Sequence, residues 1–75
     1  MDALLRAAVV TVSDGVTAGI RQDASGDSVE ALLREAGFDV AQRMVVPDDR
    51  PRIEQALREL AATHGLVVTT GGTGF

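Results

Sequence analysis

The chain has 75 residues, a formal net charge of −4 and no cysteine. A chain of this length forms at most one domain, which buries only about 60–65% of the surface that the unfolded chain exposes. The acidic balance argues against non-specific binding to nucleic acid or to a membrane surface, because both need basic patches. The absence of cysteine excludes disulfides and thiolate metal sites. No apolar run approaches the ~20 residues of a membrane span, and residues 1–6 are too few for a signal peptide, so we expect a cytoplasmic protein.

Three segments have the residue pattern of strands in a parallel sheet. Residues 7–12 (AAVVTV) form the first, which ends at the turn signal Ser13-Asp14-Gly15. The second lies within residues 38–46, and its polar middle favours an edge position. The third, starting at Leu66, is apolar and rich in β-branched residues, the pattern of a strand buried on both faces.

A first amphipathic helix is predicted between the first two strands, after a polar loop over residues 16–25. Its apolar stripe consists of Val29, Leu32, Leu33 and Ala36. Asp27 is predicted to cap its start, with Glu30 completing a capping box, and Glu30 is also placed to pair with Arg34. Gly37 supplies a left-handed stop.

A second helix is predicted from about Pro51, a residue favoured in a first helical turn, to Gly65. Its buried stripe consists of Ile53, Ala56, Leu57, Leu60 and Ala61. His64 falls in the predicted last turn, where a protonatable ring suits the helix dipole, and we interpret it as structural.

The resulting β-α-β-α-β order predicts right-handed crossovers and a parallel sheet. Parallel strands place their carboxyl ends along one edge, where open α/β sheets bind ligands. That edge collects two acidic turns, Ser13-Asp14 and Asp48-Asp49, and the glycine-rich Thr70-Gly71-Gly72-Thr73-Gly74. Glycines let a ligand approach the main chain, whose N–H groups bind anions, and carboxylates hold hard cations. The edge is therefore a candidate site for a phosphate ester and a divalent cation.

Each of these features has a structural alternative. An aspartate just before a helix is most often a cap, which applies to both Asp48 and Asp49. Asp14 fits an Asx turn equally well, and a glycine cluster without a phosphate-loop spacing also makes an ordinary tight turn.

Four separated motifs nevertheless resemble the MoaB/Mog family of molybdenum cofactor biosynthesis. They are Thr11-Val12-Ser13-Asp14 with Gly19, Asp23-Ala24-Ser25-Gly26, Pro47-Asp48-Asp49, and Thr69-Thr70-Gly71-Gly72-Thr73-Gly74. The resemblance implies a three-layer α/β/α domain with a mostly parallel sheet, commonly assembled as a homotrimer, that binds molybdopterin. In the adenylyltransferase branch the phosphate of molybdopterin attacks the α-phosphate of Mg-ATP and releases pyrophosphate.

The resemblance also implies roles for individual residues. Asp48 matches the catalytic aspartate, which holds Mg²⁺ or orients the triphosphate. The residues matching the substrate pocket are Ser13, Asp14, Thr70, Gly71, Gly72, Thr73 and Gly74. The residues matching the segment that orders the loop and opens the helix are Asp23, Ser25 and Gly26. No nucleophilic side chain is required, because the protein positions two anions and neutralises developing charge.

The family pattern continues beyond the glycine loop into segments that this sequence does not contain. We therefore expect residues 1–75 to be the N-terminal portion of a single domain of roughly twice this length. Two alternatives to the enzyme remain open. One is a non-catalytic pterin-binding or assembly member of the family, and the other is a CinA-like nucleotide-processing relative.

Overall fold

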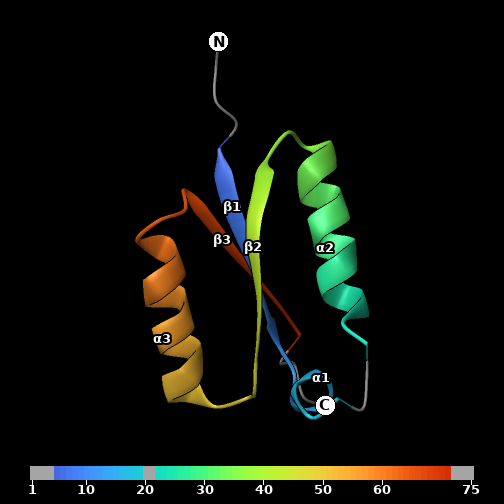
Figure 1. Cartoon of the computed structure of the whole chain (residues 1–75), viewed down its shortest axis with the longest axis vertical. Helices are drawn as coiled ribbons and strands as arrows, with labels where there is room; N and C mark the ends of the chain where they lie inside the picture. The colour runs from blue at the N-terminus through green and yellow to red at the C-terminus, as the bar shows by residue number, and fades with distance from the viewer. Residues whose placement is uncertain (1–4, 20–21, 72–75) are drawn as a thin grey trace.

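The computed structural model of the chain describes residues 5–19 and 22–71. These residues form alternating strands and helices, labelled along the chain in Figure 1. In chain order the elements are β1 (Arg6–Val12), α1 (Asp14–Thr17), α2 (Ala24–Glu35), β2 (Asp39–Val46), α3 (Arg50–Ala61) and β3 (Leu66–Gly71). The predicted β-α-β-α-β order is confirmed, with the short α1 as an addition.

β1 is the central strand of a parallel sheet whose order is β2-β1-β3. Val9 pairs with Arg43 on one side and with Val68 on the other. Residues 7–11 of β1 are almost completely buried, as expected for a parallel strand covered on both faces. The predicted parallel pairing is confirmed, and β2 lies at an edge of this sheet as its polar middle predicted.

The helices α2 and α3 lie on either side of the sheet (Figure 1). Successive side chains of a strand point to opposite faces. Val10 accordingly packs in a cluster with Leu60 of α3, whereas the next residue, Thr11, donates a hydrogen bond to Asp23 at the start of α2. The three-layer α/β/α arrangement is therefore confirmed.

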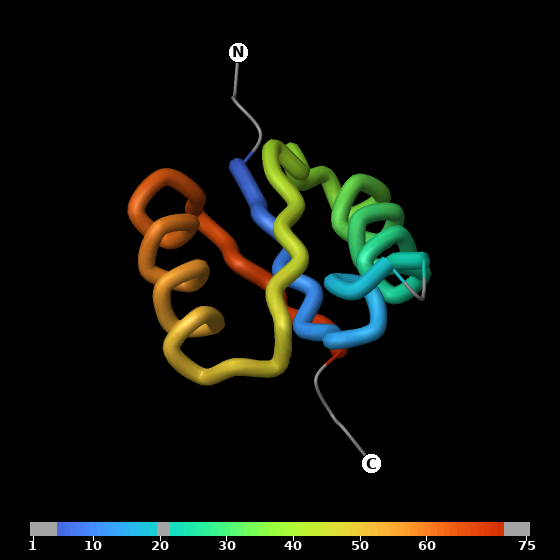
Figure 2. The backbone as a smooth tube through the Cα atoms, turned by 60° about the horizontal axis from the view of Figure 1, so that its bottom comes forward, coloured from blue at the N-terminus to red at the C-terminus, as the bar shows by residue number. Residues whose placement is uncertain are grey.

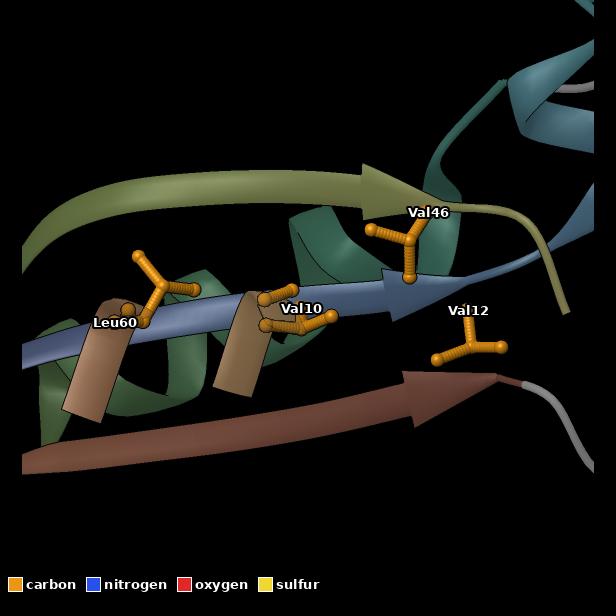
Figure 3. Close-up of a cluster of buried hydrophobic side chains, with 6 residues drawn as sticks. Val10, Val12, Val46 and Leu60 are labelled. Carbon is orange, nitrogen blue, oxygen red and sulfur yellow. The ribbon is translucent and has the colours of Figure 1, made fainter. Parts of the chain in front are cut away.

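The main apolar core lies between the sheet and α3. Its buried members are Ala8, Val10, Val12, Val46, Ala56 and Leu60. Figure 3 shows Val10 and Val12 of β1, Val46 of β2 and Leu60 of α3 gathered on the same side of the strands. This packing holds β1 and β2 in place up to their carboxyl ends, because Val12 and Val46 are the last residues of the two strands.

The prediction that the third strand is buried on both faces is wrong for the described residues. Residues 66–71 are half-buried or exposed, and β3 pairs only with β1. A run of β-branched residues correctly indicates a strand, but its burial depends on neighbours that a local pattern does not specify.

The helix α2 begins about one turn earlier than predicted. Asp23, not Asp27, is the N-cap, and its carboxylate accepts a hydrogen bond from the N–H of Gly26. Asp27 lies within the first turn, and Glu30 pairs with Arg34 as predicted. The loop expected over residues 16–25 is correspondingly shorter, since α1 occupies its first residues and α2 its last.

The predicted apolar stripes are partly wrong. Leu32 of α2, Ala36 just after α2 and Ala61 of α3 are exposed, whereas Ala56 and Leu60 are buried as predicted. Ion pairs, described below, also hold α2 to β2.

The predicted stops of the two helices have different outcomes. Gly37 has φ +94°, so the left-handed stop after α2 is confirmed. α3 ends at Ala61, so neither Gly65 nor His64 lies in its last turn. His64 is buried just beyond that turn, and its Nδ1 lies 2.9 Å from the carbonyl oxygen of Leu60, a contact that fits a structural role. Within residues 5–19 and 22–71, no helix is both long and apolar enough to cross a membrane.

Candidate functional site

The carboxyl ends of the three strands lie level at one edge of the sheet. Val12 at the end of β1 pairs with Val46 of β2 and with Gly71 of β3. Figure 2 shows the ends of the three strands and α1 at the same end of the molecule. The two acidic turns and the start of the glycine-rich loop therefore meet at this edge, as the sequence predicted.

The turn after β1 is fixed by its own hydrogen bonds. Ser13 is the N-cap of α1: its Oγ accepts a hydrogen bond from the N–H of Val16 at 3.2 Å. The carbonyl oxygen of Ser13 accepts another from the hydroxyl of Thr17 at 2.7 Å. In addition, the N–H of Ser13 donates to the carbonyl oxygen of Val46 at 2.9 Å. Ser13 is thus held to the end of β2 before any ligand is considered.

Asp14 joins the two acidic turns. Its Oδ1 accepts a hydrogen bond of 2.9 Å from the backbone N–H of Asp48, although the two residues are 34 positions apart. This bond replaces the Asx turn that the sequence left open. It also places the backbone of Asp48 beside the first helical turn after β1.

Asp48 and Asp49 differ in their local roles. Asp49 occupies the N-cap position of α3, but its side chain makes no capping hydrogen bond. Its carbonyl oxygen accepts the N–H of Ile53, which starts the helix. Asp48 lies one residue further from the helix, is exposed, and is not the cap. Of the two open interpretations, the capping position therefore belongs to Asp49, and Asp48 faces solvent at the strand edge.

Gly71 is required by the protein's own backbone. It has φ +79°, and a Cβ atom at this position would lie 2.5 Å from the carbonyl oxygen of Val12. The lack of a side chain therefore allows β3 to end against β1. Thr70 precedes it, half-buried and paired with Thr11. Gly72, Thr73 and Gly74 lie outside the described residues.

The Asp23-Ala24-Ser25-Gly26 segment connects the start of α2 to the sheet. Asp23 Oδ1 accepts the N–H of Gly26 at 3.1 Å, and Oδ2 accepts the hydroxyl of Thr11 at 3.1 Å. Gly26 is buried, whereas Ser25 is exposed at the start of the helix. These contacts place Asp23 and Gly26 at the interface between helix and sheet, and Ser25 outside it.

Sequence reasoning missed Arg43, which lies in the polar middle of β2. Its guanidinium pairs with three carboxylates of one segment: Asp23 at 2.5 Å, Asp27 at 2.7 Å and Glu30 at 3.0 Å. A signal was available, because these acids are spaced i, i+4 and i+7 and so lie on one helical face. An isolated arginine in the next strand is their natural partner.

The ion pairs shift several pKa values. Burial would by itself raise the pKa of the Asp23 carboxyl, but hydrogen bonds from Arg43, Thr11 and the Gly26 N–H outweigh this effect and lower it below its ordinary value of 3.8. Hydrogen bonds from Arg34 and Arg43 lower the pKa of Glu30. The three carboxylates raise the pKa of Arg43, which remains charged throughout the physiological range.

Stability should therefore depend on Asp23 at acidic pH. A carboxyl whose pKa is lowered on folding contributes stability above its unfolded-state pKa, and this contribution is lost as the pH falls through the folded-state pKa. We expect the free energy of unfolding, measured by urea denaturation between about pH 5 and about pH 2, to fall less steeply in Asp23→Asn than in the wild type. Thr11→Val, which removes one of the hydrogen bonds to the carboxylate, should give an intermediate slope. Equal slopes in all three proteins would contradict the assignment.

Comparison with known proteins adds the following findings. A family model described as "Probable molybdopterin binding domain" matches residues 8–75. The molybdopterin adenylyltransferase of Haemophilus influenzae is 44% identical over 78 residues, covering 99% of this chain and 40% of the relative. The crystal structure of CinA from Thermoplasma acidophilum, described as a protein of unknown function, has a TM-score of 0.88 at 30% identity and covers 95% of this chain and 42% of that one. The crystal structure of the molybdopterin biosynthesis enzyme MoaB from Thermus thermophilus has a TM-score of 0.84 at 38% identity. The match covers 96% of this chain and 46% of that one. The chain thus spans less than half the length of these relatives.

Proposed function

Because the chain belongs to the molybdopterin-binding domain family, we propose that it acts in molybdenum cofactor biosynthesis as a molybdopterin adenylyltransferase of the cytoplasm. In the reaction, a phosphate oxygen of molybdopterin forms a bond to the α-phosphorus of ATP. The bond between the α- and β-phosphates breaks, and pyrophosphate leaves. The 44% identity to the molybdopterin adenylyltransferase of Haemophilus influenzae supports this choice within the family.

The observation that carries the proposal is the hydrogen bond between Asp14 Oδ1 and the N–H of Asp48. It fixes the two acidic turns against each other at the edge where Gly71 ends β3. We assign Asp48 to the reacting phosphates, as the catalytic residue. We assign Ser13, Asp14, Thr70 and the glycine loop through Gly72, Thr73 and Gly74 to substrate binding. Asp23, Ser25 and Gly26 order the loop and open α2 beside them.

Mg²⁺ fits this arrangement as an ion shared between protein and substrate. Within the described ranges, no three histidine, cysteine, aspartate or glutamate side chains gather closely enough to hold a metal ion by themselves. Mg²⁺, however, commonly binds through one or two carboxylates together with substrate phosphates and water. We assign Asp48 to that role, and the ion would neutralise charge on the triphosphate. The protein's own part is to orient the two anions and to stabilise the charge that develops between them.

The assembly we propose is a homotrimer. Its support is the resemblance to the MoaB/Mog family, which implies this assembly. Light scattering coupled to size-exclusion chromatography would measure the mass directly.

A CinA-like, nucleotide-processing function is the second candidate, favoured by the likeness to the CinA structure. A third possibility within the family is a protein that binds pterin without turning it over. Assays with molybdopterin and with nucleotide alone distinguish these three functions. The enzyme forms adenylylated pterin and pyrophosphate, the CinA-like protein acts on a nucleotide without pterin, and the binder retains pterin and releases no pyrophosphate.

Replacing Asp48 with asparagine tests the proposal. In the whole native protein with molybdopterin and Mg-ATP, we expect kcat to fall by about 10²–10³-fold, as when one electrostatic contact to a transition state is removed. Pterin binding, followed by fluorescence, should persist. Asp49→Asn is the matched control, because Asp49 is the neighbouring aspartate and its side chain makes no capping bond. An equal loss in both variants, or no loss in Asp48→Asn, would argue against the assigned role.

A further inference from the structure

We propose that Arg43 is a positioning residue of the candidate site, which acts through Asp23 on the turn containing Ser13 and Asp14. The inference rests on the proposed function for its kinetic readout. Its structural readout does not depend on that function.

The ion pairs of Arg43 differ from an ordinary surface ion pair in their burial and in their number. Its side chain is 29% exposed and that of Asp23 only 14%. A single exposed ion pair contributes little, but a guanidinium that holds several carboxylates in one fixed geometry has little freedom to rearrange. Arg43 satisfies this condition, because Asp23, Asp27 and Glu30 all approach it within 3.0 Å.

Asp23 transmits this constraint to the sheet. The same Oδ2 that pairs with Arg43 accepts the hydroxyl of Thr11, which is 1% exposed. The other oxygen caps α2 through the N–H of Gly26. A single carboxylate thus fixes β1, β2 and the start of α2 relative to one another.

Gly26 shows how closely these groups are packed. A Cβ atom there would lie 2.7 Å from the Nη2 atom of Arg43 and would overlap the carboxylate of Asp23. A side chain at position 26 would therefore displace Asp23 or Arg43. Arginine is needed at position 43 because lysine offers one point charge instead of a planar fork of donors.

The position of this cluster connects it to the site. Thr11 lies two residues before Ser13, and Asp14 follows with the hydrogen bond that holds Asp48. The contacts consequently run from Arg43 through Asp23 and Thr11 along the end of β1 to the two acidic turns. Losing Arg43 would leave the carboxylate of Asp23 without its charge partner beside Thr11, and the end of β1 would lose this fixed contact.

Arg34 provides a matched control at the other end of the same helix. It pairs with Glu30 at 2.8 Å and donates to the carbonyl oxygen of Val40 at 3.2 Å. It therefore also ties α2 to β2, but in the last turn of the helix, near the start of β2 and away from the strand ends. If Arg43 served only to hold α2 to β2, replacing either arginine would lower stability without altering the strand ends where Asp14 and Asp48 meet.

The test compares Arg43→Met, Arg43→Lys and Arg34→Met in the whole native protein. For Arg43→Met we expect kcat with molybdopterin and Mg-ATP to fall by up to about 10²-fold, the cost of a small displacement of positioned groups, with a much smaller change in KM. Arg43→Lys should recover only part of the rate, and Arg34→Met should keep it. The amide proton resonance of Asp48, which reports its bond to Asp14, should shift in both Arg43 variants and stay in place in Arg34→Met.

The two readouts separate this inference from the proposed function. If the wild type forms no adenylylated pterin, the proposed function fails, and the Asp48 amide still tests the role of Arg43. An unchanged amide resonance in the Arg43 variants would overturn the inference, and so would equal effects of Arg43→Met and Arg34→Met. If Arg43→Met does not fold, the same test is made by comparing kcat and the Asp48 amide resonance between Arg43→Lys and Arg34→Met.

Discussion

Replacing Leu60 with alanine is expected to lower the free energy of unfolding by about 2–5 kcal/mol, the usual cost of truncating a large core side chain. Leu60 is 2% exposed and belongs to the cluster that includes Val10 of β1 and Ala56 of α3. The lost side chain would leave a cavity between the sheet and α3, because surrounding groups relax only partly into such a space. Domains are stable by about 5–15 kcal/mol, so this loss is a large fraction of the total. Urea denaturation of the variant and the wild type measures it.

Leu32→Ala is the control for this prediction. The two positions carry the same side chain in helices of the same length, but Leu32 is 65% exposed. A substitution at an exposed position usually changes stability by no more than about 0.5 kcal/mol. If Leu32→Ala destabilised the protein as much as Leu60→Ala, α2 would bury an apolar face that the described residues leave open.

The prediction for Leu60 could be made from the sequence alone, and so could much of the fold. Apolar spacing identified Ala56 and Leu60 as core residues, and a continuous apolar run identified β1 as a buried strand. Both signals are local, because a side chain's spacing along a helix or strand decides which face it occupies. The convergence of the acidic turns at one edge followed from the parallel order of the strands.

The contacts that shape the site could not be predicted in the same way. The bond from the N–H of Asp48 to Asp14 joins residues 34 positions apart and depends on the register of β1 and β2. The capping-box pattern favoured Asp27, which has Glu30 three residues on, over Asp23, where the corresponding position is Gly26. Asp23 is the cap, and its carboxylate also contacts Thr11 and Arg43. Local patterns do not rank two neighbouring caps when tertiary contacts decide between them.

The glycine-rich loop shows that a correct pattern can have a different cause. Its glycines were predicted to let a ligand approach the backbone. For Gly71, the neighbouring atom that excludes a side chain is the carbonyl oxygen of Val12, within the protein. In the proposed function, Gly71 would therefore act on ligand binding indirectly, since this residue sets the position at which β3 ends.

Replacing Gly71 with alanine should combine two costs. The first is the strain of a side chain at φ +79°, about 1–2 kcal/mol for an L-residue in this region. The second is the clash with the carbonyl oxygen of Val12, which can be relieved only by moving β3 away from β1 or by changing φ. We therefore expect the free energy of unfolding to fall by about 3 kcal/mol or more, within the range found for buried strain and overpacking. Differential scanning calorimetry would show it as a lower Tm.

Gly37→Ala separates the two costs. Gly37 also has a positive φ, +94°, but a Cβ atom there would meet nothing within 4 Å. This variant should show the strain alone, about 1–2 kcal/mol, and should leave ligand binding unchanged. Gly71→Ala should lose more stability and should also weaken pterin binding, because a displaced β3 carries Thr70 and the start of the glycine loop with it. Equal destabilisation by the two variants would show that the close approach of Val12 has no energetic consequence. β3 would then be free to shift at the strand edge where Asp14 holds Asp48.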